Sequence, residues 1–165
     1  MNIFVVSSVG EGQTQLSAFD AALNKAGVYN YNLIRLSSVI PAHSKLITSG
    51  TPKVTGEWGD KLYIVQAEMR SETPGEGIAA GIGWYQFEPD QRGVFVEHEA
   101  VGKSAEQAYQ KVEQMIRLSL EDLCKGRNMA FDDSKINHKI ISVNVKDKPT
   151  CALVIAVYQS EGWRV

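Results

Sequence analysis

The sequence is poor in the residues that build metal sites and disulfide frameworks, with two cysteines and three histidines among 165 residues. Cys124 and Cys151 have no close cysteine or histidine partner, so their spacing indicates neither a zinc site nor a redox pair. His43 and His138 also lack metal-ligand spacing. We therefore expect two buried, reduced thiols and no bound metal.

Long hydrophobic runs and blocks of one charge are missing as well. The chain has 17 basic and 19 acidic residues, with no basic run longer than a pair, which disfavours a nucleic-acid or anionic-membrane partner. No apolar stretch approaches the roughly 20 residues that span a bilayer. Residues 1–13 turn polar after a few apolar positions, which favours a first strand over a signal peptide. We expect a soluble, cytoplasmic protein that binds a small molecule.

The length and the hydrophobic content of 44% predict one compact domain over residues 1–165. The residues 61–69 and 77–87 flank Pro74 and Gly75, and this arrangement predicts a hairpin. Residue patterns along the whole chain predict a long loop over 41–60 and strands over 2–8, 31–40, 61–69, 77–87, 93–100, 139–145 and 151–158.

Two segments have helical periodicity. The first begins near Thr14 and ends at Gly27, and the second begins at Ser104, where Gln107 completes a capping box, and ends near Gly126. The second helix has an apolar stripe of Ala108, Val112, Met115, Ile116 and Leu123. Many strands with two amphipathic helices, without strict alternation, predict an α+β fold. We expect a layered α/β/β/α sandwich of largely antiparallel sheets with the helices outside.

One short motif is informative because of the residues around it. A serine pair is common, and the chain has one at Ser7-Ser8 and another at Ser37-Ser38. The second pair belongs to the frame LSAFDAALNKAG followed by NYNLIRLSSVIP. This frame resembles the pyruvoyl-dependent arginine decarboxylases, in which a helix with an Ala-Phe-Asp step precedes a strand with Asn-Leu-Ile-Arg, an aliphatic residue, Ser-Ser, two aliphatics and Pro. The resemblance is dense here, fair over 74–100 and general in the later helix and strands.

The resemblance implies that the chain cuts its own backbone between Ser37 and Ser38, giving a small chain 1–37 and a large chain 38–165. The Ser38 hydroxyl is near the preceding carbonyl, so it can attack that carbonyl and move the acyl link from nitrogen to oxygen. A strained turn and donors near the oxyanion favour this step. Elimination from the ester leaves dehydroalanine, which hydrolyses to a pyruvoyl group and ammonia. A family asparagine matching Asn32 is associated with processing, although an exposed polar strand position is the alternative.

The resemblance also implies a covalent pyruvoyl group derived from Ser38 in place of pyridoxal phosphate or a metal. Its ketone forms a Schiff base with the substrate amine, and the adjacent carbonyl accepts the electron pair released with carbon dioxide. The substrate carbon then needs a proton from a buried, neutral carboxyl group, and Glu97 matches the family's acid. Strand alternation alone would instead place Glu97 with Phe95 and Glu99 on a solvated face.

A second carboxylate, that of Asp20, is expected to bind the substrate. Leu16, Phe19 and Leu23 define the apolar stripe of the first helix, and Asp20 lies on its edge. The matching aspartate of the family binds the guanidinium of arginine, and a planar bidentate pair would distinguish arginine from lysine. The resemblance also places Leu16 and Ser37 at the substrate. A locally paired Asp20 is the alternative.

Two hypotheses follow. The leading one is a self-processing lyase, made as a zymogen, that converts L-arginine to agmatine and carbon dioxide as a homotrimer with active sites between subunits, as the family does. Polyamine biosynthesis and acid resistance are both open as its purpose. The other is a non-catalytic ligand-binding or interaction domain of the same fold, in which the Ser37-Ser38 bond stays intact. His98 and Ala100 depart from the archaeal members, which have an aromatic residue and a glycine there.

Overall fold

The computed structural model describes residues 1–164 as nine strands, two α-helices and a 3₁₀ turn. The first helix and the strands predicted over 61–69 and 77–87 begin and end within a few residues of the predicted positions. The elements in chain order are β1 (Asn2–Glu11), α1 (Gln15–Ala26), β2 (Asn32–Arg35), β3 (Val39–Ile40), β4 (Lys45–Ile47), β5 (Lys61–Ser71), β6 (Gly77–Phe87), β7 (Arg92–Gly102), α2 (Ala105–Gly126), η1 (Asp133–Lys135), β8 (Asn137–Asn144) and β9 (Thr150–Glu161).

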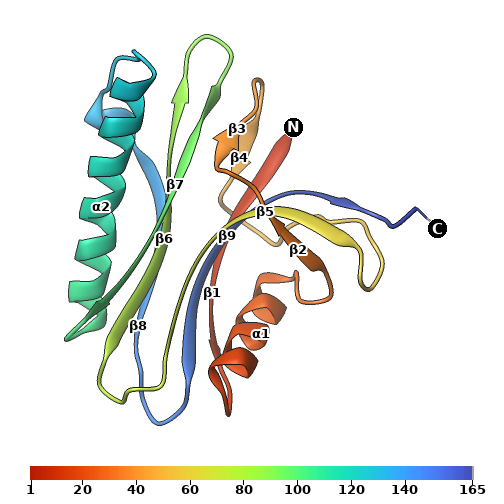
Figure 1. Cartoon of the computed structure of the whole chain (residues 1–165), viewed down its shortest axis with the longest axis vertical. Coiled ribbons are helices and arrows are strands. Elements are labelled where there is room, and N and C mark those ends of the chain that lie inside the picture. The colour runs from red at the N-terminus through yellow and green to blue at the C-terminus, as the bar shows by residue number, and fades with distance from the viewer. Residues whose placement is uncertain (165) are drawn as a thin grey trace.

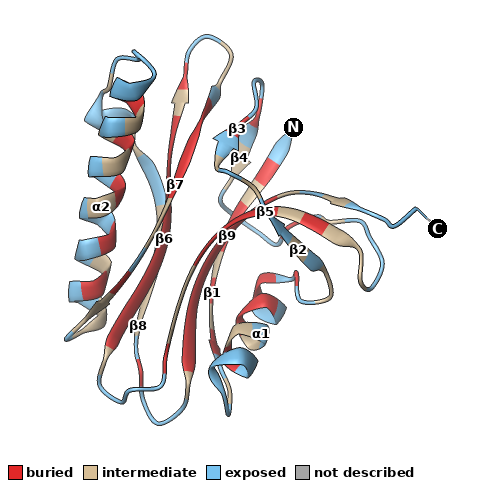
Figure 2. Ribbon diagram, viewed as in Figure 1, coloured by how far each residue is buried: buried red, intermediate tan, exposed pale blue. Residues whose placement is uncertain are grey.

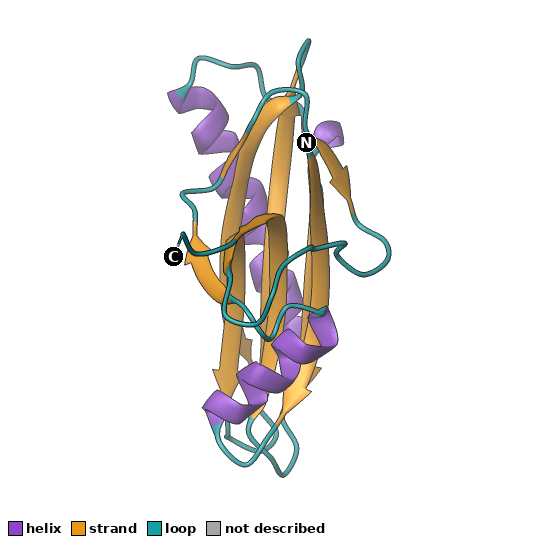
Figure 3. Cartoon of the chain, turned by 90° about the vertical axis from the view of Figure 1, so that its right-hand side faces the viewer, coloured by secondary structure: helices purple, strands orange, loops and turns teal. Residues whose placement is uncertain are grey.

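The strands form two sheets that lie face to face. The first sheet has the order β2-β5-β9-β1-β4 and the second has the order β3-β7-β6-β8. Neighbouring strands are antiparallel except in the pairs β1 with β4 and β2 with β5. Helix α1 packs on the outer face of the first sheet and α2 on that of the second (Figure 1). Figure 3 shows the same layers from the side, with one helix in front of the strands and the longer one behind. The predicted α/β/β/α sandwich is confirmed.

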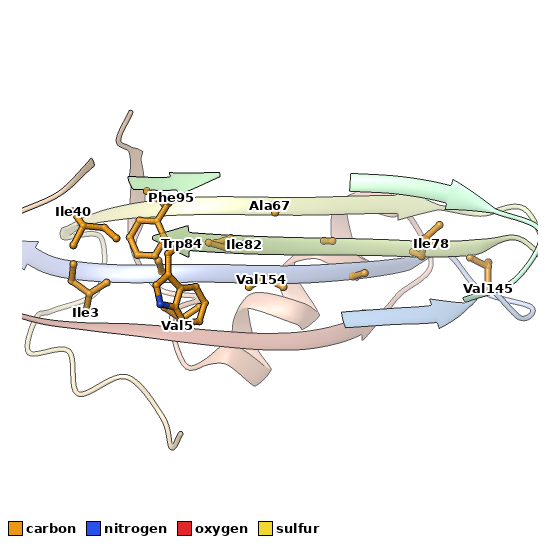
Figure 4. Close-up of a cluster of buried hydrophobic side chains, with 14 residues drawn as sticks. Ile3, Val5, Ile40, Ala67, Ile78, Ile82, Trp84, Phe95, Val145 and Val154 are labelled. Atoms are coloured by element: carbon orange, nitrogen blue, oxygen red, sulfur yellow. The ribbon is translucent and has the colours of Figure 1, made fainter. Parts of the chain in front are cut away.

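The main hydrophobic core lies between the two sheets. Its side chains come from both inner faces and include Ile82, Trp84 and Phe95, with the ring of Phe95 edge-on to that of Trp84 at a centroid distance of 6.3 Å (Figure 4). Separate clusters fill the spaces beneath α1 and α2. The long central strands are therefore buried on both faces, whereas the short strands β2, β3 and β4 are largely exposed or half-buried (Figure 2).

The helix caps follow the sequence with one correction. The Thr14 hydroxyl accepts from the Ser17 backbone N–H, and Ser17 returns a bond to the Thr14 backbone, so α1 has the reciprocal box. At α2 the Ser104 hydroxyl accepts from the Gln107 N–H, as predicted, but the Gln107 side chain accepts from the N–H of Lys103 at 2.7 Å. The predicted reciprocal box at Ser104 is therefore wrong, because the Gln107 amide reaches one residue beyond the cap.

Helix α1 lies on the sheet through small residues, which corrects its predicted apolar stripe. A Cβ at Gly10 would lie 2.1 Å from the Ala18 carbonyl oxygen, so the glycine allows the helix to approach β1 closely. Ala18 and Leu23 are buried, but Leu16 is 70% exposed. The buried face of α1 therefore consists mainly of small side chains. It does not include Leu16, which was expected to belong to the apolar stripe.

The predicted hairpin of residues 61–69 and 77–87 is also wrong. These segments form β5 and β6, which belong to different sheets, and β6 pairs instead with β7 and β8. The connection around Gly75 carries the chain from one sheet to the other. Residues 64–67 of β5 and almost all of β6 are buried on both faces, so neither strand has a burial alternation that would assign it to a particular neighbour.

The predicted continuous strand over residues 31–40 is divided into two short strands. Strand β2 pairs with β5 in the first sheet, and β3 pairs with β7 in the second. Residues 36–38 connect them, so the chain crosses between the sheets at Ser37 and Ser38. This crossing brings the serine pair to the edge of the sandwich, beside β7.

Candidate active site

The backbone of Ser38 has an unusual conformation. Its φ angle is 64°, in the left-handed region that residues with a Cβ rarely adopt. A residue held there stores about 1–2 kcal/mol of conformational strain. The strain lies directly on the C-terminal side of the Ser37-Ser38 peptide bond, where a strained turn would favour the acyl shift.

Two contacts fix Ser38 against β7. Its hydroxyl donates a short hydrogen bond to the Oε1 atom of Glu97, 59 residues away in the sequence. Its main-chain carbonyl oxygen accepts from the backbone N–H of Phe95 at 2.8 Å. The structure thus joins two of the predicted site residues, Ser38 and Glu97, through a direct contact.

The position of Glu97 follows from the alternation along β7. Val94 and Val96 point toward α2, whereas Phe95 points into the core between the sheets. Glu97 is two residues beyond Phe95 and lies on the same side of the strand. The first sheet covers this side of β7 at Phe95, and the side is half-buried at Glu97. The prediction from alternation alone, that this face is solvated, is therefore wrong at Glu97.

A pocket of about 430 Å³ opens at this edge of the molecule. It contains Ser37, Ser38 and Glu97, and its opposite wall comes from the C-terminal half of α2. The volume is large enough for a small amino acid. The remaining lining residues are Val94, Phe95, Val96, His98, Ser119, Asp122, Leu123 and Arg127.

His98 lies on the helix side of β7 and lines the same pocket. Its Nε2 atom is 2.8 Å from the Oγ atom of Ser119 in α2. Burial lowers the pKa of the imidazole, so the ring is neutral at pH 7. This histidine was left without a role by sequence reasoning, and its partner Ser119 could not be identified from the α2 periodicity.

Glu99 has a different partner from Glu97. Its Oε1 atom accepts from the Glu68 backbone N–H at 3.3 Å. Partial removal from solvent raises the pKa of the Glu99 carboxyl, and the charges of Glu97 and Glu68 act in the same direction. The carboxylate of Glu68 in turn forms ion pairs with Arg35 at 3.5 Å and with Arg70 at 2.9 Å.

Tyr158 of β9 is a residue that sequence reasoning missed. Its hydroxyl donates to the main-chain oxygen of Val39 at 3.0 Å, directly after Ser38. Burial raises the pKa of the phenol, and the nearby charge of Glu97 adds to the effect. The only signal in the sequence is a tyrosine at the end of an otherwise apolar strand.

Three other predicted site residues do not meet Ser38 within one chain. The Asn32 side-chain amide lies on β2 and donates to the Gly59 carbonyl at 2.5 Å. Asp20 and Leu16 are exposed on α1. None of the three lines the Ser38 pocket.

Comparison with known proteins assigns the chain to a family. A family model described as pyruvoyl-dependent arginine decarboxylase matches residues 2–162. The chain belongs to this family. The pyruvoyl-dependent arginine decarboxylase of Thermococcus kodakarensis is 31% identical over 163 residues, which cover 93% of this chain and 92% of the relative. That of Pyrococcus abyssi is 33% identical over 153 residues, covering 93% and 91%. That of Halobacterium salinarum is 43% identical over 75 residues, 46% of each chain.

Decarboxylases of this family depend on a covalent pyruvoyl group, and the surroundings of Ser38 fit such a group. A hydroxyl follows the peptide bond in a strained turn, and the Ser38 carbonyl already has a backbone donor in Phe95. Within residues 1–164 no three His, Cys, Asp or Glu side chains are grouped so that they could hold a metal ion. In the same part of the chain, neither helix has the length and hydropathy needed to cross a membrane.

Proposed function

We propose that this member of the family cleaves itself between Ser37 and Ser38 and converts L-arginine to agmatine and carbon dioxide. The observation that carries the proposal is the strained Ser38, whose hydroxyl contacts Glu97 inside a pocket. A serine in a relaxed strand with a backbone partner would have neither the conformation nor the carboxylate needed for this chemistry. The family assignment supplies the reaction class.

Processing begins with the Ser38 hydroxyl. Its oxygen attacks the Ser37 carbonyl carbon, the C–N bond breaks, and the nitrogen takes up a proton as the ester forms. Glu97 accepts the hydroxyl hydrogen in the folded chain and is placed to receive the proton as the oxygen attacks. Elimination then removes the Ser38 α-hydrogen and breaks the Cβ–O bond, which leaves Ser37 as a free carboxylate. Water hydrolyses the remaining dehydroalanine to the pyruvoyl group and ammonia.

The pyruvoyl group supplies the electron-withdrawing carbonyls that make loss of carbon dioxide possible. The residues of the chain provide the surroundings. The Phe95 N–H, 2.8 Å from the Ser38 carbonyl oxygen, stabilises negative charge that develops on that oxygen. Glu97 is close enough to the reacting centre to hold the proton that replaces the carboxyl group on the substrate carbon.

Recognition of the guanidinium is assigned to Asp20 of a neighbouring copy in a homotrimer. Asp20 and Leu16 are four residues apart and lie on one exposed face of α1, where Leu16 is 70% exposed. This face is available to another subunit and is absent from the pocket of its own chain. A site shared between subunits accounts for both observations. Asn32 is assigned to processing through the family match, with its amide held beside the loop at Gly59.

Intact mass spectrometry of the purified protein tests the proposal. We expect two fragments, 1–37 and 38–165, and the larger should carry the mass of a pyruvoyl group in place of its N-terminal serine. Incubation with arginine should then release agmatine. A single chain of 165 residues with the mass of the sequence would favour the unprocessed binding domain instead.

A further inference from the structure

We propose that Tyr158 is a positioning residue that anchors the new chain end formed by cleavage, and so keeps the residue-38 carbonyl beside Glu97. The inference rests on the proposed self-cleavage. Tyr158 is about 120 positions from the proposed cut in the sequence. Its hydroxyl donates one hydrogen bond to the segment that follows the cut, to the Val39 carbonyl at 3.0 Å.

The need for an anchor arises from the change that cleavage makes. In the intact chain, residue 38 is held from both sides, because the Leu36 N–H donates to the Ile64 carbonyl at 2.8 Å on the upstream side. After the cut, this upstream contact no longer restrains residue 38. The pyruvoyl group also has no amide nitrogen, so the backbone torsion held at 64° in the intact chain no longer exists, its strain is released, and the free end can rotate.

Few hydrogen bonds remain to oppose that movement, and the first residue of the segment that is buried in the core is Ile40. Strand β3 pairs with β7 over two residues only, Val39 with Val94 and Ile40 with Gly93. Chain ends that are held by few hydrogen bonds fray. Beyond the strand pairing, the segment has the bond from Phe95 to the residue-38 carbonyl and the bond from Tyr158 to the next carbonyl. These two donors hold consecutive carbonyl groups.

The surroundings of Tyr158 suit a fixed donor. Its ring is edge-on to that of Phe95, with a centroid distance of 6.3 Å. Phe95, whose N–H binds the residue-38 carbonyl, therefore packs against Tyr158, whose hydroxyl binds the Val39 carbonyl. Burial and the charge of Glu97 raise the pKa of the phenol, which therefore keeps its proton at any working pH. Tyr158 comes from the central strand β9 of the first sheet, whereas Val39 lies in β3 of the second, so the bond also joins the two sheets at the site.

Tyr63 provides a matched control. It lines the same pocket of about 360 Å³ on the far side of the serine pair, together with Leu36, Val39 and Tyr158. Its hydroxyl donates to Glu161 at 2.6 Å and not to the cleaved segment. Tyr63→Phe and Tyr158→Phe therefore remove the same atom from neighbouring positions, and only the second removes a bond to the new chain end.

The test compares the wild type and both variants before and after cleavage. Intact mass gives the extent of cutting, hydrogen exchange of the Phe95 amide reports on its bond to the residue-38 carbonyl, and steady-state kinetics give kcat and KM for arginine. In cleaved Tyr158→Phe we expect Phe95 exchange to rise about tenfold and kcat to fall about tenfold, the equivalent of one hydrogen bond. Cutting should be almost complete, KM should change little, and Tyr63→Phe should behave as the wild type.

The same exchange measurement in an uncut Ser38→Ala background separates anchoring from general stability. There, adding Tyr158→Phe should change Phe95 exchange far less, because the upstream chain still restrains the segment. Equal loosening in cut and uncut protein would overturn the proposal, as would unchanged exchange and kcat in the cleaved variant. Failure of Tyr158→Phe to cut would place its action before cleavage and also overturn it. A wild type that never cuts would instead refute the proposed function on which this inference rests.

Discussion

The two serine pairs of this chain have the same sequence and very different environments. Ser7-Ser8 lies in the middle of β1, in register with Val154 and Leu153 of β9. Ser8 is 7% exposed, and its hydroxyl donates to the Ala22 carbonyl of α1 at 2.7 Å. That hydroxyl is held by a neutral backbone acceptor within a regular strand, where the backbone is unstrained.

Ser37-Ser38 lies where the chain leaves one sheet and enters the other. Ser38 has a φ of 64°, and its hydroxyl donates to the carboxylate of Glu97. A carboxylate can accept a proton as well as a hydrogen bond, whereas a peptide carbonyl at neutral pH cannot. The two pairs therefore differ in backbone conformation and in the acceptor of the hydroxyl, which the residue type alone does not reveal.

The largest expected effect comes from removing the reactive hydroxyl. Ser38→Ala should remain one uncut chain without activity, because alanine cannot form the ester. Ser8→Ala should cut as completely as the wild type, although it removes a hydroxyl from an identical dipeptide. Intact mass of both variants, with Ser37→Ala as an intermediate case that still cuts, measures this difference. Two fragments from Ser38→Ala, broken at the same bond, would exclude the acyl shift.

Changing the acceptor separates maturation from turnover. In Glu97→Gln the side chain keeps an oxygen that can accept a hydrogen bond from Ser38 but cannot take up its proton, so cutting should persist at a lower rate. It has no acidic proton to deliver, so turnover of arginine should fall about 100-fold or more. Fragment masses and kcat measured on the same sample give both results. Glu99→Gln is the control, because its carboxylate contacts the Glu68 N–H and not Ser38. Near-normal turnover in Glu97→Gln would transfer the acid role to another group.

The proposed contact to the substrate guanidinium is made by Asp20, which is remote from the Ser38 pocket in a single chain. Asp20→Asn keeps one acceptor oxygen but loses the charge of the bidentate contact, so the preference for arginine over lysine should fall about tenfold, as expected for a charged hydrogen bond. The ratio of kcat/KM for the two substrates measures this preference. An unchanged ratio would remove Asp20 from guanidinium recognition.

Subunit mixing tests the shared site directly. Ser38→Ala subunits have an intact Asp20 and no pyruvoyl group, whereas Asp20→Asn subunits have the reverse. If each site combines residues of two copies, co-folded mixtures should use arginine better than either variant alone. If the mixture is never more active than the Asp20→Asn protein alone, the whole site lies within one chain.

Much of the fold could be predicted because local signals agreed with it. Thr14 and Gly27 bound α1, and Ser104 begins α2, because capping residues act over three or four positions. Strand pairing was harder, since the middle of β5 and almost all of β6 are buried on both faces and nothing local assigns them to different sheets. The break at Ser38 could not be predicted by residue type either, because serine has no preference for positive φ.

The site divides in the same way. Ser38 and Glu97 could be predicted through a family motif, and the structure joins them. Tyr158 and Ser119 could not, because their contacts to Val39 and His98 connect segments that are far apart in sequence and depend on how the sheets and α2 pack. The helical pattern predicted that Asp20 lies on the edge of the apolar stripe of α1. That pattern could not predict which copy of the chain Asp20 would contact.

The smallest expected effect is on stability, and it distinguishes a structural serine from a reactive one. In an uncut Ser38→Ala background, adding Ser8→Ala should lower the free energy of unfolding by about 1 kcal/mol, because the buried bond to the Ala22 carbonyl is lost. Ser7→Ala is the matched control: Ser7 is the neighbouring residue of the same strand and is only half-buried, so the change should stay within about 0.5 kcal/mol. Urea denaturation gives both values, with the slope m checked for constancy. Because all three proteins are uncut, the comparison is free of the effect of chain cleavage. Equal stability of the Ser7 and Ser8 variants would mean that the bond from Ser8 to α1 contributes nothing, and that the two serine pairs differ only in chemistry.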